Sequence, residues 1–113
     1  MVGMILLEIV KIAPTPEKRE ELLDVLRSIR GPTLAMNDCL ECGIWEGDED
    51  GGEILFLVYW QSWEAFMQHV RSHLYARMLA ALELSREEPV VSFYDVTAIR
   101  GMDFINAVRN QKS

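Results

Sequence analysis

The amino-acid sequence predicts an α+β fold in which helices cover an antiparallel sheet, with the element order β-α-β-β-α-β. Three observations support this prediction. Four short segments are rich in β-branched and aromatic residues, two longer segments carry apolar residues at helical spacing, and an acidic, glycine-rich turn separates the second and third strand segments. This order is the ferredoxin-like arrangement, which places both helices on one face of the sheet. The length of 113 residues fits one such domain.

The chain begins with a strand followed by a helix. Residues 4–12 are mostly aliphatic and predict the first strand. Thr15 and Pro16 suit the N-cap and the first position of a helix. Apolar residues then recur at helical spacing to about Arg30, where Gly31-Pro32 predicts the end of the helix.

The middle of the chain predicts a β-hairpin. Segments 39–46 and 53–60 flank a turn that is rich in Gly and acidic residues. The second segment is apolar on both faces, and the first and last strands also offer apolar residues on both faces. Because the helices cover one face only, a monomer would expose an apolar sheet to water. We therefore expect a homodimer built through the sheet faces.

A second helical region and a last strand complete the domain. Ser62 suits the N-cap of a helical stretch that runs to about residue 84, with a break expected near Ser72. Residues 90–97 predict the fourth strand.

The sequence divides into a domain at 1–97 and a C-terminal tail at 98–113. The tail predicts a short amphipathic helix at 103–110. Large apolar residues at helical spacing are unusual for a free terminus, so we expect the helix to pack on this chain or on a dimer partner. These residues are Phe104, Ile105 and Val108.

The charge and hydropathy of the chain argue against several partners. The net charge of −7 disfavours nucleic acid, which needs clustered Lys and Arg. Much of this charge lies in the acidic loop at 46–53. No apolar run has the length of a signal peptide or a membrane span, so we expect a cytoplasmic protein without membrane contact.

The two cysteines, Cys39 and Cys42, have C-x-x-C spacing but lie in a predicted strand. Residues three apart on a strand point to opposite faces, which would strain a disulfide. Zinc usually needs two further soft ligands. We expect two reduced, half-buried thiols and no metal site, and a redox or metal role is the alternative.

Segment 58–75 resembles the antibiotic biosynthesis monooxygenase domain family, and the similarity extends over residues 4–97. The family has a Trp at a strand end, a Ser at a helix start, a Glu-Ala or similar pair, and then a His and a Ser before an aromatic residue. The matching residues here are Trp60, Ser62, Glu64-Ala65, His69, Ser72 and Tyr75. Two positions depart from the family pattern, because an acid is replaced by Val58 and a Pro-Gly turn by Asn37-Asp38.

The resemblance implies a homodimer whose two sheets form a dimeric α+β barrel, with a pocket between sheet and helices in each protomer. Some members oxidise quinols or phenolic aromatics with O₂ and no cofactor, whereas others degrade haem. The haem-degrading pattern is not matched at Leu7, His69 and Leu79. We therefore expect neither a cofactor nor haem binding.

His69 is the candidate catalytic residue, because imidazole accepts a proton near neutral pH. Its alternatives are a structural histidine or, with His73 four residues along one helical stripe, a metal ligand. The candidate substrate pocket consists of Trp60, Trp63, Phe66, His73 and Tyr75, for which core packing is the alternative.

The functional prediction is a cofactor-independent monooxygenase that acts on a small quinol or phenolic aromatic with O₂. The alternative is a non-catalytic module on the same fold, which binds a small molecule or serves as a dimeric interaction unit.

Overall fold

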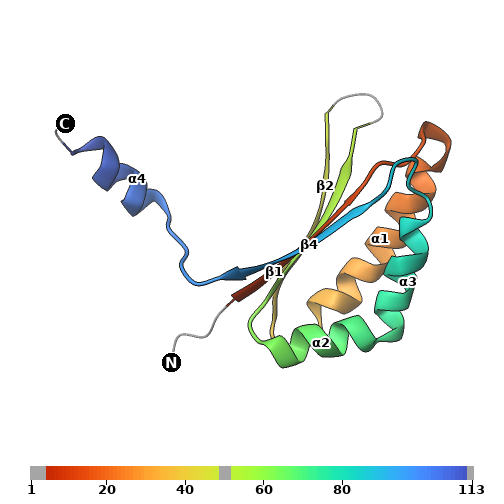
Figure 1. Cartoon of the computed structure of the whole chain (residues 1–113), viewed down its shortest axis with the longest axis horizontal. Helices are drawn as coiled ribbons and strands as arrows, with labels where there is room; N and C mark the ends of the chain where they lie inside the picture. Colours follow the sequence, from red (N-terminus) through yellow and green to blue (C-terminus); the bar gives the residue numbers. More distant parts are fainter. Residues whose placement is uncertain (1–4, 49–51, 112–113) are drawn as a thin grey trace.

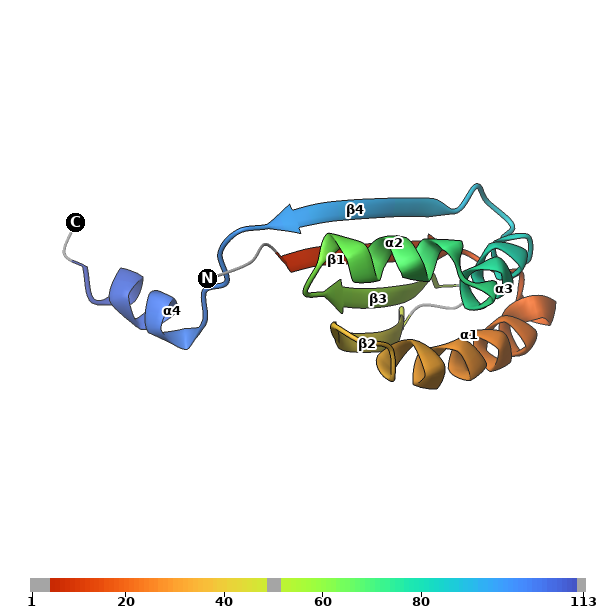
Figure 2. The same cartoon turned by 90° about the horizontal axis from the view of Figure 1, so that it is seen from below.

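A computed structural model describes residues 5–48 and 52–111. The predicted α+β, ferredoxin-like fold is confirmed, with one antiparallel sheet in the strand order β2-β3-β1-β4. Helices α1, α2 and α3 lie on one side of the sheet, and α4 stands apart from the domain (Figures 1 and 2). The elements are β1 (Ile5–Ile12), η1 (Pro16–Lys18), α1 (Arg19–Leu34), β2 (Cys39–Glu46), β3 (Ile54–Trp60), α2 (Trp63–Arg71), α3 (His73–Leu82), β4 (Val90–Val96) and α4 (Met102–Arg109).

The two central strands, β1 and β3, alternate strictly between buried and half-buried residues. Their buried residues face the helices and form the core with α1 and α3. Trp60 lies on this helix-facing side, and its neighbour Tyr59 lies on the other. The helix-facing residues are Leu6, Glu8, Val10, Ile12, Ile54, Phe56, Val58 and Trp60.

Helix α1 is longer than predicted. It follows the short η1 turn and continues through Gly31-Pro32 to Leu34, so the predicted end near Arg30 is wrong. Pro32 has no backbone N–H, so the last turn of the helix lacks one hydrogen bond. Packing outweighs this local cost, since Thr33 is fully buried and extends the stripe of Leu22, Leu26 and Ile29 by one turn.

Two serines set the boundaries of the second helical region. The hydroxyl of Ser62 accepts a hydrogen bond from the Ala65 backbone N–H at 3.1 Å and caps α2. The hydroxyl of Ser72 accepts one from the Tyr75 N–H at 3.1 Å and caps α3. The break predicted near Ser72 is therefore present, and the chain changes direction between two helices there.

Asp38 explains how the chain replaces the Pro-Gly turn before β2. Its φ of 64° is in the left-handed region, which Asp tolerates better than most residues. Its carbonyl accepts a hydrogen bond from the Gln61 N–H at 2.8 Å, and its carboxylate accepts one from the Ser62 hydroxyl at 3.0 Å. The turn is thereby tied to the start of α2.

The two cysteines share one face of the sheet, so the expectation that they point to opposite faces is wrong. A register shift between Cys39 and Glu41 leaves Cys39 opposite Trp60 and Cys42 opposite Val58. The extra residue of this bulge turns both thiols toward the helices. Both are free, and burial raises the pKa of Cys42 to about 12 and also raises that of Cys39. Both are therefore thiols at neutral pH.

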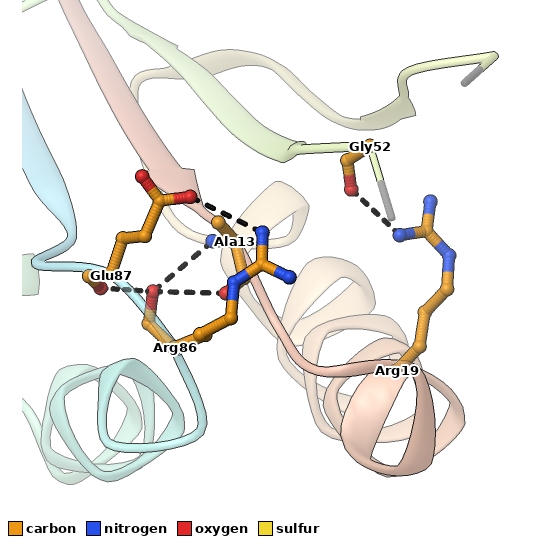
Figure 3. A network of polar contacts seen from close by, with 6 residues as sticks. Ala13, Arg19, Gly52, Arg86 and Glu87 are labelled. Carbon is orange, nitrogen blue, oxygen red and sulfur yellow. Dashed lines mark hydrogen bonds and ion pairs between the residues drawn. The ribbon is translucent and has the colours of Figure 1, made fainter. Parts of the chain in front are cut away.

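Polar contacts fasten the far end of the sheet. Ser85 accepts a hydrogen bond from the Ala13 N–H at 3.1 Å, which ties the loop before β4 to the end of β1. Arg19, at the start of α1, donates to the Gly52 carbonyl at 2.7 Å (Figure 3). The β2–β3 hairpin is thus held against α1. None of the helices in the described ranges is long and apolar enough to span a membrane.

Candidate functional site

Four side chains from four different elements meet beneath the helices and form a buried centre. Glu8 comes from β1, Trp60 from β3, His69 from the last turn of α2 and Tyr75 from the first turn of α3. The Trp60 indole N–H donates to the Glu8 carboxylate at 3.3 Å. The His69 ring lies 4.8 Å from the Trp60 ring and 4.9 Å from the Tyr75 ring, centre to centre.

The Glu8 and His69 side chains are both completely buried and adjacent. His69 Nε2 lies 3.4 Å from Glu8 Oε1, close enough for an ion pair but without the alignment of a hydrogen bond. Glu8 Oε2 and both imidazole nitrogens have no hydrogen-bond partner among the described residues. Buried polar groups are nearly always paired, with protein or with a bound molecule. The centre therefore has unused capacity to bind a small polar group.

Tyr75 closes the centre on the α3 side. Burial, followed by the nearby Glu8 carboxylate, raises the pKa of the Tyr75 hydroxyl to about 12. The phenol therefore remains protonated at neutral pH.

Glu8 is the functional candidate that the sequence analysis missed. It lies directly opposite Val58 in the register of β1 and β3, and both side chains are buried on the helix-facing side. Val58 is the position where the family pattern places an acid, so the neighbouring strand supplies a carboxylate to the same region. The sequence could have predicted that Glu8 is buried, because alternation along β1 places it on the same face as the apolar residues Leu6 and Val10.

The structure brings most of the predicted site residues together. Trp60, His69 and Tyr75 belong to the buried centre, and Phe66 is buried one turn before His69. Trp63 lies at the edge, half-exposed, with its ring 5.7 Å from that of Phe66.

His73 does not join the other site residues. It is exposed and is the first residue of α3, whereas His69 belongs to α2. The predicted common stripe of the two histidines is therefore wrong, because the break at Ser72 separates them. Among the residues that the structure describes, no group of three or more His, Cys, Asp or Glu side chains is arranged to hold a metal ion.

An aromatic pair lies beside the buried centre, where α2 meets the edge strand β4. Phe93 on β4 lies opposite Glu8 in the register. Its half-exposed ring packs against Phe66 at 4.9 Å between centroids. Glu8, Trp60 and His69 are completely buried, so their side chains occupy space between sheet and helices where a pocket was expected.

Comparison with known proteins relates this fold to one family. The sequence model of the family described as antibiotic biosynthesis monooxygenase matches residues 5–81. A search for similar curated proteins found no match.

Several solved structures share the fold. A conserved protein from Methanosarcina mazei Go1 is 22% identical, with a TM-score of 0.76 over 85% of this chain and 96% of its own. Rv0793 from Mycobacterium tuberculosis is 23% identical, with a TM-score of 0.76 over 86% of this chain and 99% of its own. A protein named antibiotic biosynthesis monooxygenase is 20% identical, with a TM-score of 0.72 over 82% of this chain and 99% of its own.

Proposed function

The chain belongs to the antibiotic biosynthesis monooxygenase family, and we propose that it is a cofactor-independent monooxygenase that oxidises a small quinol or phenolic aromatic with O₂. The observation that carries this proposal is the buried carboxylate–imidazole pair of Glu8 and His69, whose remaining polar atoms have no partner in the described part of the chain.

In the proposed reaction His69 acts as the general base. Its imidazole accepts the proton of the substrate hydroxyl, and the Glu8 carboxylate stabilises the imidazolium that forms. The resulting electron-rich anion reduces O₂ directly. The reduced oxygen forms a bond to a ring carbon that carries hydrogen. Loss of this hydrogen as a proton and cleavage of the O–O bond leave a carbonyl on the ring and release the other oxygen atom as water, so that the substrate supplies all four electrons.

The aromatic residues of the centre provide the binding surface. Trp60 and Tyr75 both pack against the His69 ring and can hold a planar substrate beside the base. Their apolar surroundings exclude water from the anion. Displacement of the Phe66–Phe93 pair opens the path from the β4 edge.

A His69→Ala variant tests the proposal. Loss of a general base typically lowers the rate by about 10²–10⁴-fold. Oxygen uptake measured across a panel of hydroquinones and hydroxylated polycyclic aromatics should fall by that factor, whereas the exposed His73→Ala variant should retain full activity. A folded His69→Ala protein with undiminished uptake would contradict the assignment.

The oligomeric state is part of the proposal. The side of the sheet away from the helices, here called the open face, has no covering layer among the described residues (Figure 1). We propose that two copies stack these faces, because an exposed apolar sheet of this extent marks an interface. Light scattering at micromolar concentration should give twice the monomer mass. The open face includes Ile5, Leu7, Ile9, Leu55, Leu57, Tyr59 and Tyr94.

The closed state of the centre favours one second candidate function, a module that binds a small molecule without turnover. Binding would then displace the Phe66–Phe93 pair and fill the centre without consuming oxygen. A saturable rise in melting temperature with a phenolic ligand, in the absence of oxygen uptake, would support this alternative.

A further inference from the structure

Helix α4 has no packing partner among the residues that the structure describes. None of its residues is buried, and both views show it projecting away from the domain (Figures 1 and 2). An isolated helix of eight residues has little stability in water. We therefore expect the apolar face of α4 to pack against another surface. Its large apolar side chains are between 47% and 64% exposed, namely Met102, Phe104, Ile105 and Val108.

A shallow hollow of about 370 Å³ lies at the base of the β2–β3 hairpin. Trp45 and Leu55 provide apolar walls on the open face, and Trp45 is 60% exposed. Acidic residues surround these walls. Arg19 ties the hairpin to α1 through the Gly52 carbonyl at 2.7 Å (Figure 3) and through the Glu46 carboxylate at 3.1 Å. The full lining is Lys11, Trp45, Glu46, Gly47, Asp48, Gly52, Glu53 and Leu55.

The ends of α4 and the lining of the hollow carry side chains of opposite charge. Arg100 and Arg109 flank the apolar residues of α4, and the Arg100 guanidinium lies 5.4 Å from the centre of the Phe104 ring. The hollow presents Glu46, Asp48 and Glu53 around an aromatic wall. α4 also carries Asp103 in its first turn, and Lys11 lines the hollow. The charge match is therefore between the two arginines that flank the apolar residues and the acidic residues around Trp45.

The two features lie at opposite ends of the same sheet. Strand β4 ends at Val96 opposite Ile5, whereas the hollow adjoins Lys11, six residues further along β1 and about 20 Å away. The connection at 97–101 spans about 20 Å only when fully extended. To reach the hollow of its own chain it would have to reverse direction and also cross neighbouring strands. In the structure it leads away from the sheet (Figure 1).

In a dimer, α4 of one copy and the hollow of the other copy can lie at the same end. When two sheets stack about a two-fold axis with their strands antiparallel, the end where β4 leaves one copy lies over the hairpin end of the other. Each copy then donates one helix and receives one. The solved structures above are covered over 96–99% of their own length but over at most 86% of this chain, so part of this chain has no counterpart in them.

We propose that α4 is an exchange arm that packs into the hairpin hollow of a second copy of this chain, with its apolar residues on Trp45 and Leu55 and its arginines beside the acidic rim. This proposal depends on the dimer proposed above but not on the proposed reaction at His69.

Crosslinking between differently labelled chains tests the arm directly. In a Cys39→Ala/Cys42→Ala background with unchanged circular dichroism, one chain carries Ile105→Cys and the other carries Trp45→Cys. After subunit exchange and mild oxidation, we expect a disulfide between the two different chains. A matched control replaces Trp45→Cys by Leu34→Cys, which is exposed on α1. Equal yields with the control would overturn the proposal, as would exclusive intrachain bonding in a chain that carries both substitutions.

Removal of the arm provides the second measurement. A chain that ends at Ile99 should dimerise about 10–100-fold more weakly in sedimentation equilibrium, since several apolar side chains lose their contact. The quadruple variant Phe104→Ser/Ile105→Ser/Val108→Ser/Met102→Ser should match it. An unchanged dissociation constant would overturn the arm even if the dimer itself forms, and an intact chain that is monomeric would overturn both.

Discussion

On the helix-covered side of β1, Glu8 is completely buried beside His69, whereas on the other side Leu7 and Ile9 are half-buried with no covering layer in the described chain. A sheet that served stability alone would bury the aliphatic side chains and expose the carboxylate. In β1 the carboxylate is buried and the aliphatic residues are partly exposed, which indicates that the two faces of the sheet have different roles. The covered face carries polar groups suited to chemistry, and the open face carries an apolar surface suited to assembly.

The sharpest test of this comparison uses two adjacent residues of β3. Phe56 faces the helices and is fully buried, whereas Leu57 lies on the open face. Phe56→Glu places a charge in the core and should prevent folding, because an unpaired buried charge costs more than the total stability of a small domain. Leu57→Glu should leave the circular dichroism spectrum native and yield a monomer in light scattering. A native dimer with Leu57→Glu would break the distinction between the faces.

The second test moves the buried carboxylate between strands. Glu8→Val should lower oxygen uptake by about 10²–10⁴-fold, because His69 loses the group that stabilises its protonated form. Since Val58 lies opposite Glu8 on the same face, Val58→Glu in the Glu8→Val background should restore part of the activity. Urea unfolding of each variant separates loss of function from loss of fold. A double variant that folds but remains as inactive as Glu8→Val would show that the position of the carboxylate, and not only its presence, is required.

The element order and the hairpin were predictable because hydrophobic periodicity and turn residues are local signals. The break at Ser72 was predictable for the same reason. The continuation of α1 through Pro32 was not, because it depends on the burial of Thr33 against the rest of the domain. The bulge at Leu40 also escapes sequence patterns, since one unpaired residue reverses the side to which every later residue points.

The candidate site was only half predictable. His69 and Trp60 were singled out from a motif, but their carboxylate partner comes from a strand more than fifty positions away in sequence. Only the register of β1 and β3 brings Glu8 to them. The common stripe of His69 and His73 was wrongly predicted, because four-residue spacing places two side chains on one face only while the helix is continuous.

A smaller effect is expected at the turn that supports the covered face. Asp38→Ala removes the carboxylate that accepts from Ser62 and places at a φ of 64° a residue that adopts the left-handed region less readily than Asp does. Together these changes should cost about 1–2 kcal/mol in the free energy of unfolding. Asp38→Gly relieves the backbone and should cost less, although it also loses the side-chain contact. Urea denaturation of both variants measures the difference. Equal losses would show that the backbone conformation contributes nothing.

The smallest effect concerns the pH dependence of stability on the covered face. Burial and the Glu8 carboxylate raise the pKa of Tyr75 to about 12 in the native state, whereas in the unfolded chain it lies near 10. Between these values the unfolded state has released the proton and the native state retains it, so stability falls as pH rises through this window. Tyr75→Phe removes this contribution, so the free energy of unfolding should decline less steeply between about pH 10 and 12. The thiol of Cys42 also titrates in this range, but it is present in both proteins and does not affect the difference between them. Tyr94→Phe, on the open face, controls for loss of a surface hydroxyl. Parallel alkaline declines for the wild-type chain and Tyr75→Phe would show that the phenol is not held protonated by the buried centre.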